Sequence, residues 1–187
     1  MSTDKSLRIL AAAACCLGLT AASHATVLLP ADLGDLAREA RSIARGRVAA
    51  VDAEWSDDRR TIETVVTLEV ETYLKGPLGG TLQFRVPGGS LGRYRRIFVG
   101  APEFSVDQRV VVFLGAQGPS VPYVLGLSQG VFRLVPNADG SSWSVRPAPA
   151  LPASSSAPLA VRGDPARQSM PLAEFEQRVR ALVGGLR

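Results

Sequence analysis

The residue types that most often perform catalysis or bind metals gather at the start of this chain. Its only histidine is His24, and its only cysteines are Cys15 and Cys16. Histidine is the usual general base near neutral pH, and imidazoles and thiolates are the usual ligands of zinc. Whether these three side chains stay in the functional protein therefore decides which chemistry is open to it.

The first 25 residues have the three parts of a secretory signal peptide. Lys5 and Arg8 give a basic start, residues 9–22 form an apolar run, and Ser23-His24-Ala25 is a small-X-small cleavage site. We expect cleavage after Ala25, which removes every thiol and the imidazole. The expectation is an exported protein, periplasmic or extracellular, that is not an enzyme and uses no cofactor or metal.

Two other interpretations of this segment stay open. Cys15, or Cys16 beside it, follows alanines in a pattern that loosely resembles a lipid-attachment motif, although the chain continues apolar to Ala22. The segment could also remain as an anchor, but its apolar run is shorter than the roughly 20 residues that span a bilayer. We therefore expect no transmembrane segment after signal cleavage.

A serine motif offers the next candidate chemistry. Gly88-Gly89-Ser90-Leu91-Gly92 matches the G-x-S-x-G of a hydrolase nucleophile elbow, which needs a strand, a sharp turn, a helix and a histidine base. The residues after Ser90 have no helical pattern. Lys75 could replace the histidine, but it lies beside Gly76-Pro77, where we expect a solvated, protonated side chain. A glycine-rich turn is the favoured interpretation.

One basic and aromatic cluster is a candidate interaction surface. It consists of Arg93, Tyr94, Arg95, Arg96 and Phe98. Such a cluster could contact a protein, a glycan or a lipid headgroup, or it could be a plain solvated strand face. Arginines between aromatic residues also bind single-stranded nucleic acid, but export argues against that partner, and we expect no nucleic acid.

Acidic and indole side chains complete the candidates. Asp57 and Asp58 could join a calcium loop, yet Arg59 and Arg60 follow directly, so a charged hairpin turn is favoured. Three carboxylates alternate with apolar residues and fit an outward strand face: Glu63, Glu69 and Glu71. We expect both tryptophans, Trp55 and Trp143, in the core or at the end of a barrel rather than as sugar platforms.

Length and charge place the chain among single-domain proteins. Removing residues 1–25 from the 187 leaves 162, enough for one domain with its own core. The whole chain has 21 basic and 17 acidic side chains, a net charge of +4. Signs are mixed along the chain, so composition gives no nucleic-acid footprint.

Hydrophobic periodicity predicts the elements that position these residues. A short helix capped by Asp32 is predicted over 31–40, and a second helix with Ser169 as its cap over 169–185. Between them, strands are predicted over 43–55, 62–74, 81–86, 93–99, 109–114, 123–127, 131–135 and 143–145. The segment 147–168 is rich in Pro, Ala and Ser and is predicted to be a linker.

The predicted fold is mainly β. We expect a small closed or partly open antiparallel β-barrel, similar to an oligonucleotide/oligosaccharide-binding fold, over residues 26–146, with a short N-terminal helix and a C-terminal helix. Gly46 in the first long strand marks a bulge or a close backbone approach.

Five short segments within residues 32–146 resemble a family of uncharacterised exported bacterial proteins. They are Arg45-Gly46-Arg47-Val48, residues 65–70 (VVTLEV), Tyr73-Leu74-Lys75-Gly76, residues 85–89 (RVPGG) and residues 126–130 (GLSQG). The pattern is more distantly similar to the netrin-like barrel of tissue inhibitors of metalloproteinases. The resemblance implies the fold. In those inhibitors an N-terminal cysteine chelates the protease zinc, and the mature chain here has no cysteine to do so.

The leading functional hypothesis is an exported, non-catalytic binding domain for an extracytoplasmic protein or glycan, and an inhibitor-like action on an extracellular enzyme is one form of this hypothesis. An envelope accessory protein that docks through the linker and terminal helix is the first alternative. A hydrolase using Ser90 is the second.

Overall fold

The computed structural model describes residues 31–185 except 117–120, 139, 141 and 148–167. The predicted signal peptide with its cleavage after Ala25, the lipidation alternative and nearly all of the predicted linker lie outside the described residues. Two helices are described, α2 (Leu33–Glu39) and α3 (Leu172–Gly184). The strands and one 3₁₀ turn are β1 (Ser42–Trp55), β2 (Ile62–Lys75), β3 (Thr81–Pro87), β4 (Gly89–Leu91), β5 (Tyr94–Arg96), β6 (Arg109–Gly115), β7 (Tyr123–Val124), η1 (Leu127–Gly130), β8 (Val131–Pro136), β9 (Trp143–Pro147) and β10 (Met170–Pro171).

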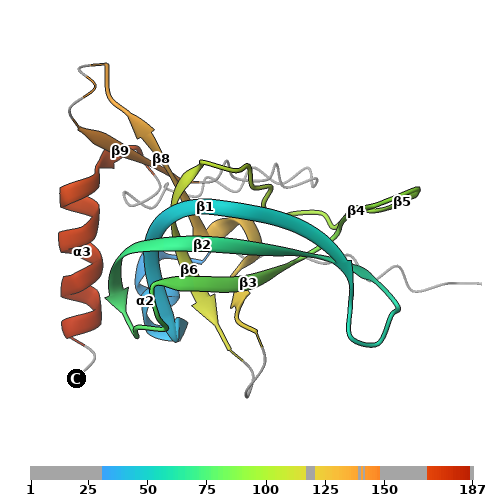
Figure 1. Cartoon of the computed structure of the whole chain (residues 1–187). Helices are drawn as coiled ribbons and strands as arrows, with labels where there is room; N and C mark the ends of the chain where they lie inside the picture. The colour runs from blue at the N-terminus through green and yellow to red at the C-terminus, as the bar shows by residue number, and fades with distance from the viewer. Residues whose placement is uncertain (1–30, 117–120, 139, 141, 148–167, 186–187) are drawn as a thin grey trace, which may run out of the picture.

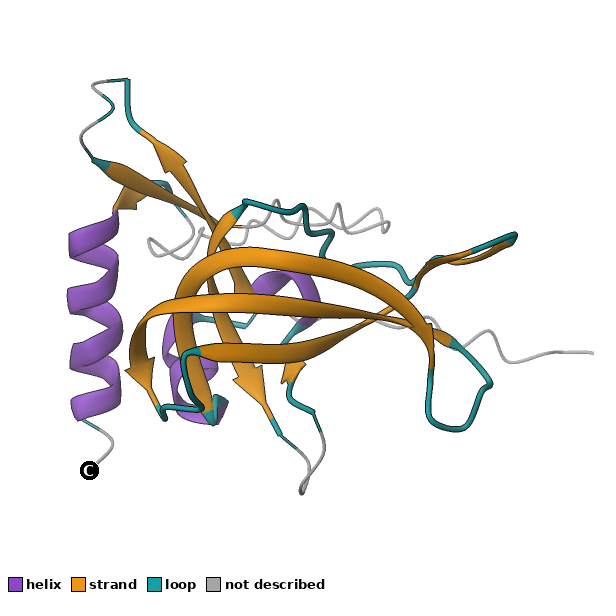
Figure 2. Ribbon diagram, viewed as in Figure 1, coloured by secondary structure: helices purple, strands orange, loops and turns teal. Residues whose placement is uncertain are grey.

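Five strands close into a ring in the order β1-β2-β3-β7-β6, because β6 also pairs with β1 (Figure 1). All of these pairings are antiparallel except the contact between β3 and β7, a single parallel pair of Arg85 with Tyr123. Strands β8, β9 and β10 continue the sheet from β6. The predicted mainly β class with a helix near each end is confirmed (Figure 2).

Strand β6 shows why a continuously apolar run was needed at this position. Its side chains alternate, so Val111 and Phe113 belong to the core under the helices, while Val110, Val112 and Leu114 fill the interior of the ring. All five side chains are fully buried. A strand covered on both faces has no polar face to show in its sequence.

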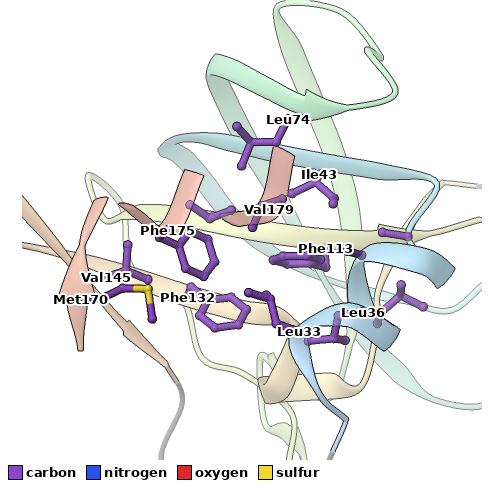
Figure 3. Close-up of a cluster of buried hydrophobic side chains, with 14 of the residues drawn as sticks. Leu33, Leu36, Ile43, Leu74, Phe113, Phe132, Val145, Met170, Phe175 and Val179 are labelled. Atoms are coloured by element: carbon purple, nitrogen blue, oxygen red, sulfur yellow. The ribbon is translucent and has the colours of Figure 1, made fainter. Parts of the chain in front are cut away.

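The two helices pack on the outer face of the ring and of the strands that extend it. Asp32 caps α2 as predicted, since its carboxylate accepts a hydrogen bond from the Asp35 amide at 2.6 Å. In α3, Phe175 and Val179 are fully buried among the side chains drawn in Figure 3. The rings of Phe132 and Phe175 lie 4.8 Å apart, which fastens the C-terminal helix to the sheet.

Strands β1 and β2 form a long ribbon that reaches beyond the helices (Figure 1). Its register shifts between Arg45 and Gly46, and a Cβ at Gly46 would lie 2.2 Å from the carbonyl oxygen of Glu69. Both predicted roles of Gly46, bulge and close backbone approach, are therefore present. The far end of this ribbon lies beside the β4–β5 hairpin.

Three predicted elements differ from the structure by three residues at one end. Only Tyr94–Arg96 of the expected strand 93–99 forms a strand, β5, which pairs with β4 in a separate two-stranded sheet. The expected strand 123–127 ends at Val124, because Gly126 takes a left-handed conformation before η1. Helix α3 begins after Pro171 rather than Ser169, because Met170 and Pro171 pair with β9.

Candidate interaction surface

The β4–β5 hairpin projects from the end of the molecule opposite α3 (Figure 1). We define the distal surface as Trp55, the hairpin Gly89–Arg96 and the following residues Ile97–Val99. Gly92 has a φ of +57° at the first central position of the two-residue turn, where a turn of type II′ requires glycine. Gly88 has a φ of +91° and leaves no room for a side chain beside the carbonyl oxygen of Arg96. The glycines therefore build a hairpin.

Aromatic contacts fasten the hairpin to the ribbon. The rings of Trp55 and Tyr94 meet edge to face with centroids 5.6 Å apart. The guanidinium of Arg93 lies 5.0 Å from the centre of the Tyr94 ring and donates a hydrogen bond to the Tyr94 hydroxyl at 2.8 Å. Such pairs each contribute about 0.5–1.5 kcal/mol. The sequence gave no sign of the contact between Tyr94 and Trp55.

Arg95 and Arg96 differ from most arginines of the ribbon and ring. All three residues of β5 are exposed, and neither Arg95 nor Arg96 forms an ion pair with a described carboxylate. By contrast, Arg47 donates hydrogen bonds to Asp107 and Glu69. These bonds, chiefly the one to Asp107, raise the pKa of Arg47 above its ordinary value. Two cations without a described counter-charge therefore stand on one short strand.

Apolar side chains follow these cations directly. Ile97 is 72% exposed and Val99 is 80% exposed, with Phe98 and Tyr94 each about half exposed. Scattered exposed apolar residues are ordinary, whereas consecutive ones mark contact surfaces. The structure brings the predicted cluster of Arg93, Tyr94, Arg95, Arg96 and Phe98 onto the hairpin and its exit loop and adds two β-branched neighbours.

A shallow open cavity of about 410 Å³ lies beside Trp55 and is lined by Ser56, Asp57 and Arg59 as well. Asp57 is engaged, since its carboxylate accepts hydrogen bonds from Arg85 at 3.3 Å. Ser56 donates to Asp58 at 2.7 Å, and this bond, with the Arg60 amide, holds the pKa of Asp58 below its ordinary value. The two aspartates thus serve a charged turn, as the favoured interpretation had it.

Sequence reasoning missed the partners of Arg85. The Arg85 guanidinium lies 3.2–3.3 Å from three carboxylates. They belong to Glu54 of β1, Asp57 of the following turn and Glu63 of β2. Burial alone lowers the pKa of Arg85, but the hydrogen bond to Asp57 and the three negative charges outweigh it and raise the pKa. Only the strand register brings these residues together, so no local motif reveals them.

Ser90 and Lys75 lie at opposite ends of β2. Ser90 belongs to the hairpin beside Ile62, the first residue of β2, whereas Lys75 is its last residue. The strand before Ser90 leads into a hairpin turn and not into a helix. Lys75 is also not simply solvated, which corrects the expectation, because its ammonium donates to the carbonyl oxygens of Ala37 and Arg38 at 2.7 and 3.1 Å. It caps the C-terminal end of α2.

The remaining candidates have structural surroundings. Trp143 packs at the edge of the helix-covered core, with the guanidinium of Arg109 5.0 Å from its ring centre. Glu71 pairs with Arg45 and Arg109, and Glu69 pairs with Arg47. In the described part of the chain, no group of three or more His, Cys, Asp or Glu is placed to hold a metal ion.

Neither described helix combines the length and the apolarity needed to cross a bilayer. Comparison of the chain with protein-family models, with curated proteins and with solved structures finds no match. The distal surface must therefore be interpreted from its own chemistry.

Proposed function

We propose that this chain is an exported, non-catalytic binding domain and that it contacts its partner through the distal surface. The observation that carries the proposal is the combination of Arg95 and Arg96, which have no described counter-charge, with the exposed side chains of Ile97 and Val99. Neighbouring exposed apolar side chains mark contact surfaces, and binding surfaces are enriched in arginine and in aromatic residues such as Tyr94 and Phe98. The secretory pattern of residues 1–25 supports export.

The placement of α3 favours this proposal over docking through the terminal helix. On the apolar side of α3, Phe175 and Val179 are fully buried against the chain's own sheet, and Leu172, Leu182 and Val183 pack partly buried on the same core. Glu176 of the same helix accepts a hydrogen bond from Arg45 at 2.7 Å. A helix engaged in this way offers a partner only its polar side.

The placement of Ser90 likewise supports a binding role over hydrolysis. Its side chain is exposed on a two-stranded hairpin, and the described chain brings no histidine or lysine near it. A serine without a base has the nucleophilicity of an ordinary alcohol.

Site-specific photocrosslinking in the producing cell tests the proposal. A photoreactive phenylalanine analogue replaces Tyr94 in one full-length variant and exposed Glu174 of α3 in a control variant. We expect a discrete crosslinked partner from position 94 and none from position 174. Equal crosslinking from both positions, or none from position 94, would refute a binding role for the distal surface.

A further inference from the structure

We infer that the distal surface binds an acidic, extended polypeptide segment by adding it as a third strand along β5. This inference deepens the proposed function and rests on it. It identifies the partner by chemistry: a protein segment with carboxylates and an extended backbone.

The free edge of β5 carries the first step of the argument. Among the described strands, β5 pairs with β4 alone, and the two form a sheet separate from the ring. Leu91 and Tyr94 close the two-residue turn as a hydrogen-bonded pair, so the next pair, Ser90 with Arg95, is not hydrogen-bonded. The N–H and C=O groups of Arg95 consequently point away from β4, where an added strand would meet them.

Composition along this edge supports pairing. Residues after Arg96 are Ile97, Phe98 and Val99, the β-branched and aromatic types that strands favour. A two-stranded ribbon is only marginally stable by itself, and a third strand brings it to the size of a stable sheet. An added segment would therefore extend β5 to Ile97 and cover its exposed side chain, after which the chain turns, because the Ala101 amide donates a hydrogen bond to the Phe98 carbonyl oxygen at 3.1 Å.

Charge selects an acidic partner. Residues 87–102 contain three arginines and no carboxylate. A second copy of this chain pairing edge to edge along β5 would set arginines against arginines, and like charges facing each other across strands are destabilising. A segment rich in Asp or Glu supplies the missing counter-charges instead.

The distribution of these arginines also argues against a membrane as partner. Tyr94 and Arg96 point to one face of the β4–β5 hairpin and Arg95 to the other, because side chains alternate along a strand. A ribbon that lies on a bilayer needs one apolar face and one cationic face. Here both faces carry a cation, which suits contact along the edge.

The experiment uses the full chain and a fluorescent, end-capped peptide of alternating Glu and Val or Thr residues. Fluorescence anisotropy measures its binding, and hydrogen exchange follows the Arg95 amide. We expect salt-sensitive binding that slows exchange at Arg95. A peptide with the same sequence but N-methylated at every second amide should bind about tenfold more weakly or worse, because it cannot complete the strand ladder.

Variants separate the edge from general electrostatics. The double variant Arg95→Glu/Arg96→Glu should weaken peptide binding by about tenfold or more. The matched control Arg146→Glu/Arg178→Glu makes the same charge change at two exposed positions near the helix-covered end, and should change it by less than about twofold.

Several results would overturn strand addition. They are failure of the acidic peptide to bind, equal binding of its N-methylated form, and binding to phosphatidylglycerol vesicles in place of the peptide. A dimer of the native chain that Arg95→Glu/Arg96→Glu dissociates would show that β5 pairs with a second copy. Crosslinks from position 94 that persist beside any of these results would leave the proposed function standing and remove only the strand-addition mechanism.

Discussion

The arginines at the two ends of this molecule differ in burial and in ion pairing. At the helix-covered end, Arg45 pairs with Glu176 at 2.7 Å and with Glu71 at 3.4 Å, and its side chain is 22% exposed. At the distal end, Arg95 and Arg96 are exposed and have no described carboxylate partner. The first arrangement holds elements together, whereas the second leaves charge available to another molecule.

Apolar side chains divide in the same way. Phe175 and Phe113 are fully buried under the helices, while Phe98 is about half exposed beside the hairpin. Under the proposed function, stability and contact with a partner reside in separate parts of the fold.

The largest expected effect comes from Phe175→Ala. Removing a fully buried ring that packs on Phe132 should lower the free energy of unfolding by about 3–5 kcal/mol. Phe98→Ala, the same change at the distal surface, should lower it by less than about 1 kcal/mol. Urea unfolding followed by tryptophan fluorescence measures both. Similar losses from the two variants would contradict the separation.

Gly46→Ala should cost about 2–3 kcal/mol, because the new Cβ would collide with the Glu69 carbonyl oxygen inside the ribbon. Gly80→Ala is the matched control, since no atom lies within 4 Å of its added Cβ. We expect the control to change stability by about 0.5 kcal/mol or less. Thermal melts of both variants by circular dichroism check this, and a tolerated Gly46→Ala would mean that the bulge is absent.

Glu176→Gln should cost about 1.5 kcal/mol, because it removes the charge that accepts hydrogen bonds from Arg45 and Arg180. Exposed Glu174 on the same helix provides the control Glu174→Gln, which should have little effect. Chemical denaturation with guanidinium would screen the pair, so urea is the suitable denaturant. An unchanged Glu176→Gln variant would show that α3 is held by apolar packing alone.

The smallest expected effect concerns Ser56→Ala in the turn between β1 and β2. Losing the Ser56 hydroxyl should raise the pKa of Asp58 toward its ordinary value, which NMR titration of the carboxyl carbon measures. A lowered pKa in the folded state stabilises the protein above the unfolded pKa, near about pH 4, and that stability disappears as pH falls through the folded pKa. The native chain should therefore lose on acidification the part of its advantage over Ser56→Ala that comes from Asp58, while the hydrogen bonds of the Ser56 hydroxyl to the Thr61 backbone stay. An unshifted Asp58 pKa in the variant would disprove the link.

Sequence periodicity predicted much of the helix-covered end. The apolar stripe of α3, the cap at Asp32 and the buried run of β6 all use side chains whose spacing reflects their burial. The distal hairpin was predicted only as an irregular strand over 93–99. All residues of β5 are exposed and those of β4 are exposed or partly buried, so the hairpin carries no hydrophobic alternation from which it could be identified.

Long-range pairing accounts for the rest of what the sequence could not show. The ion cluster of Arg85 depends on the register of three strands, and Lys75 reaches α2 only because β2 ends beside that helix. The aromatic and basic types of the candidate site were readable from the sequence. Their free edge and missing counter-charges were not, since both depend on what the fold leaves unpaired.

The central claim is that the distal surface binds and the helix-covered end stabilises. Its most direct test is photocrosslinking from position 94 in the chain that also carries Arg95→Glu/Arg96→Glu, with Arg146→Glu/Arg178→Glu as the comparison. We predict that the crosslinked partner disappears only with the first pair of substitutions, while urea unfolding of both chains stays within about 0.5 kcal/mol of the parent. A partner that is still captured after reversal of Arg95 and Arg96 would contradict the account.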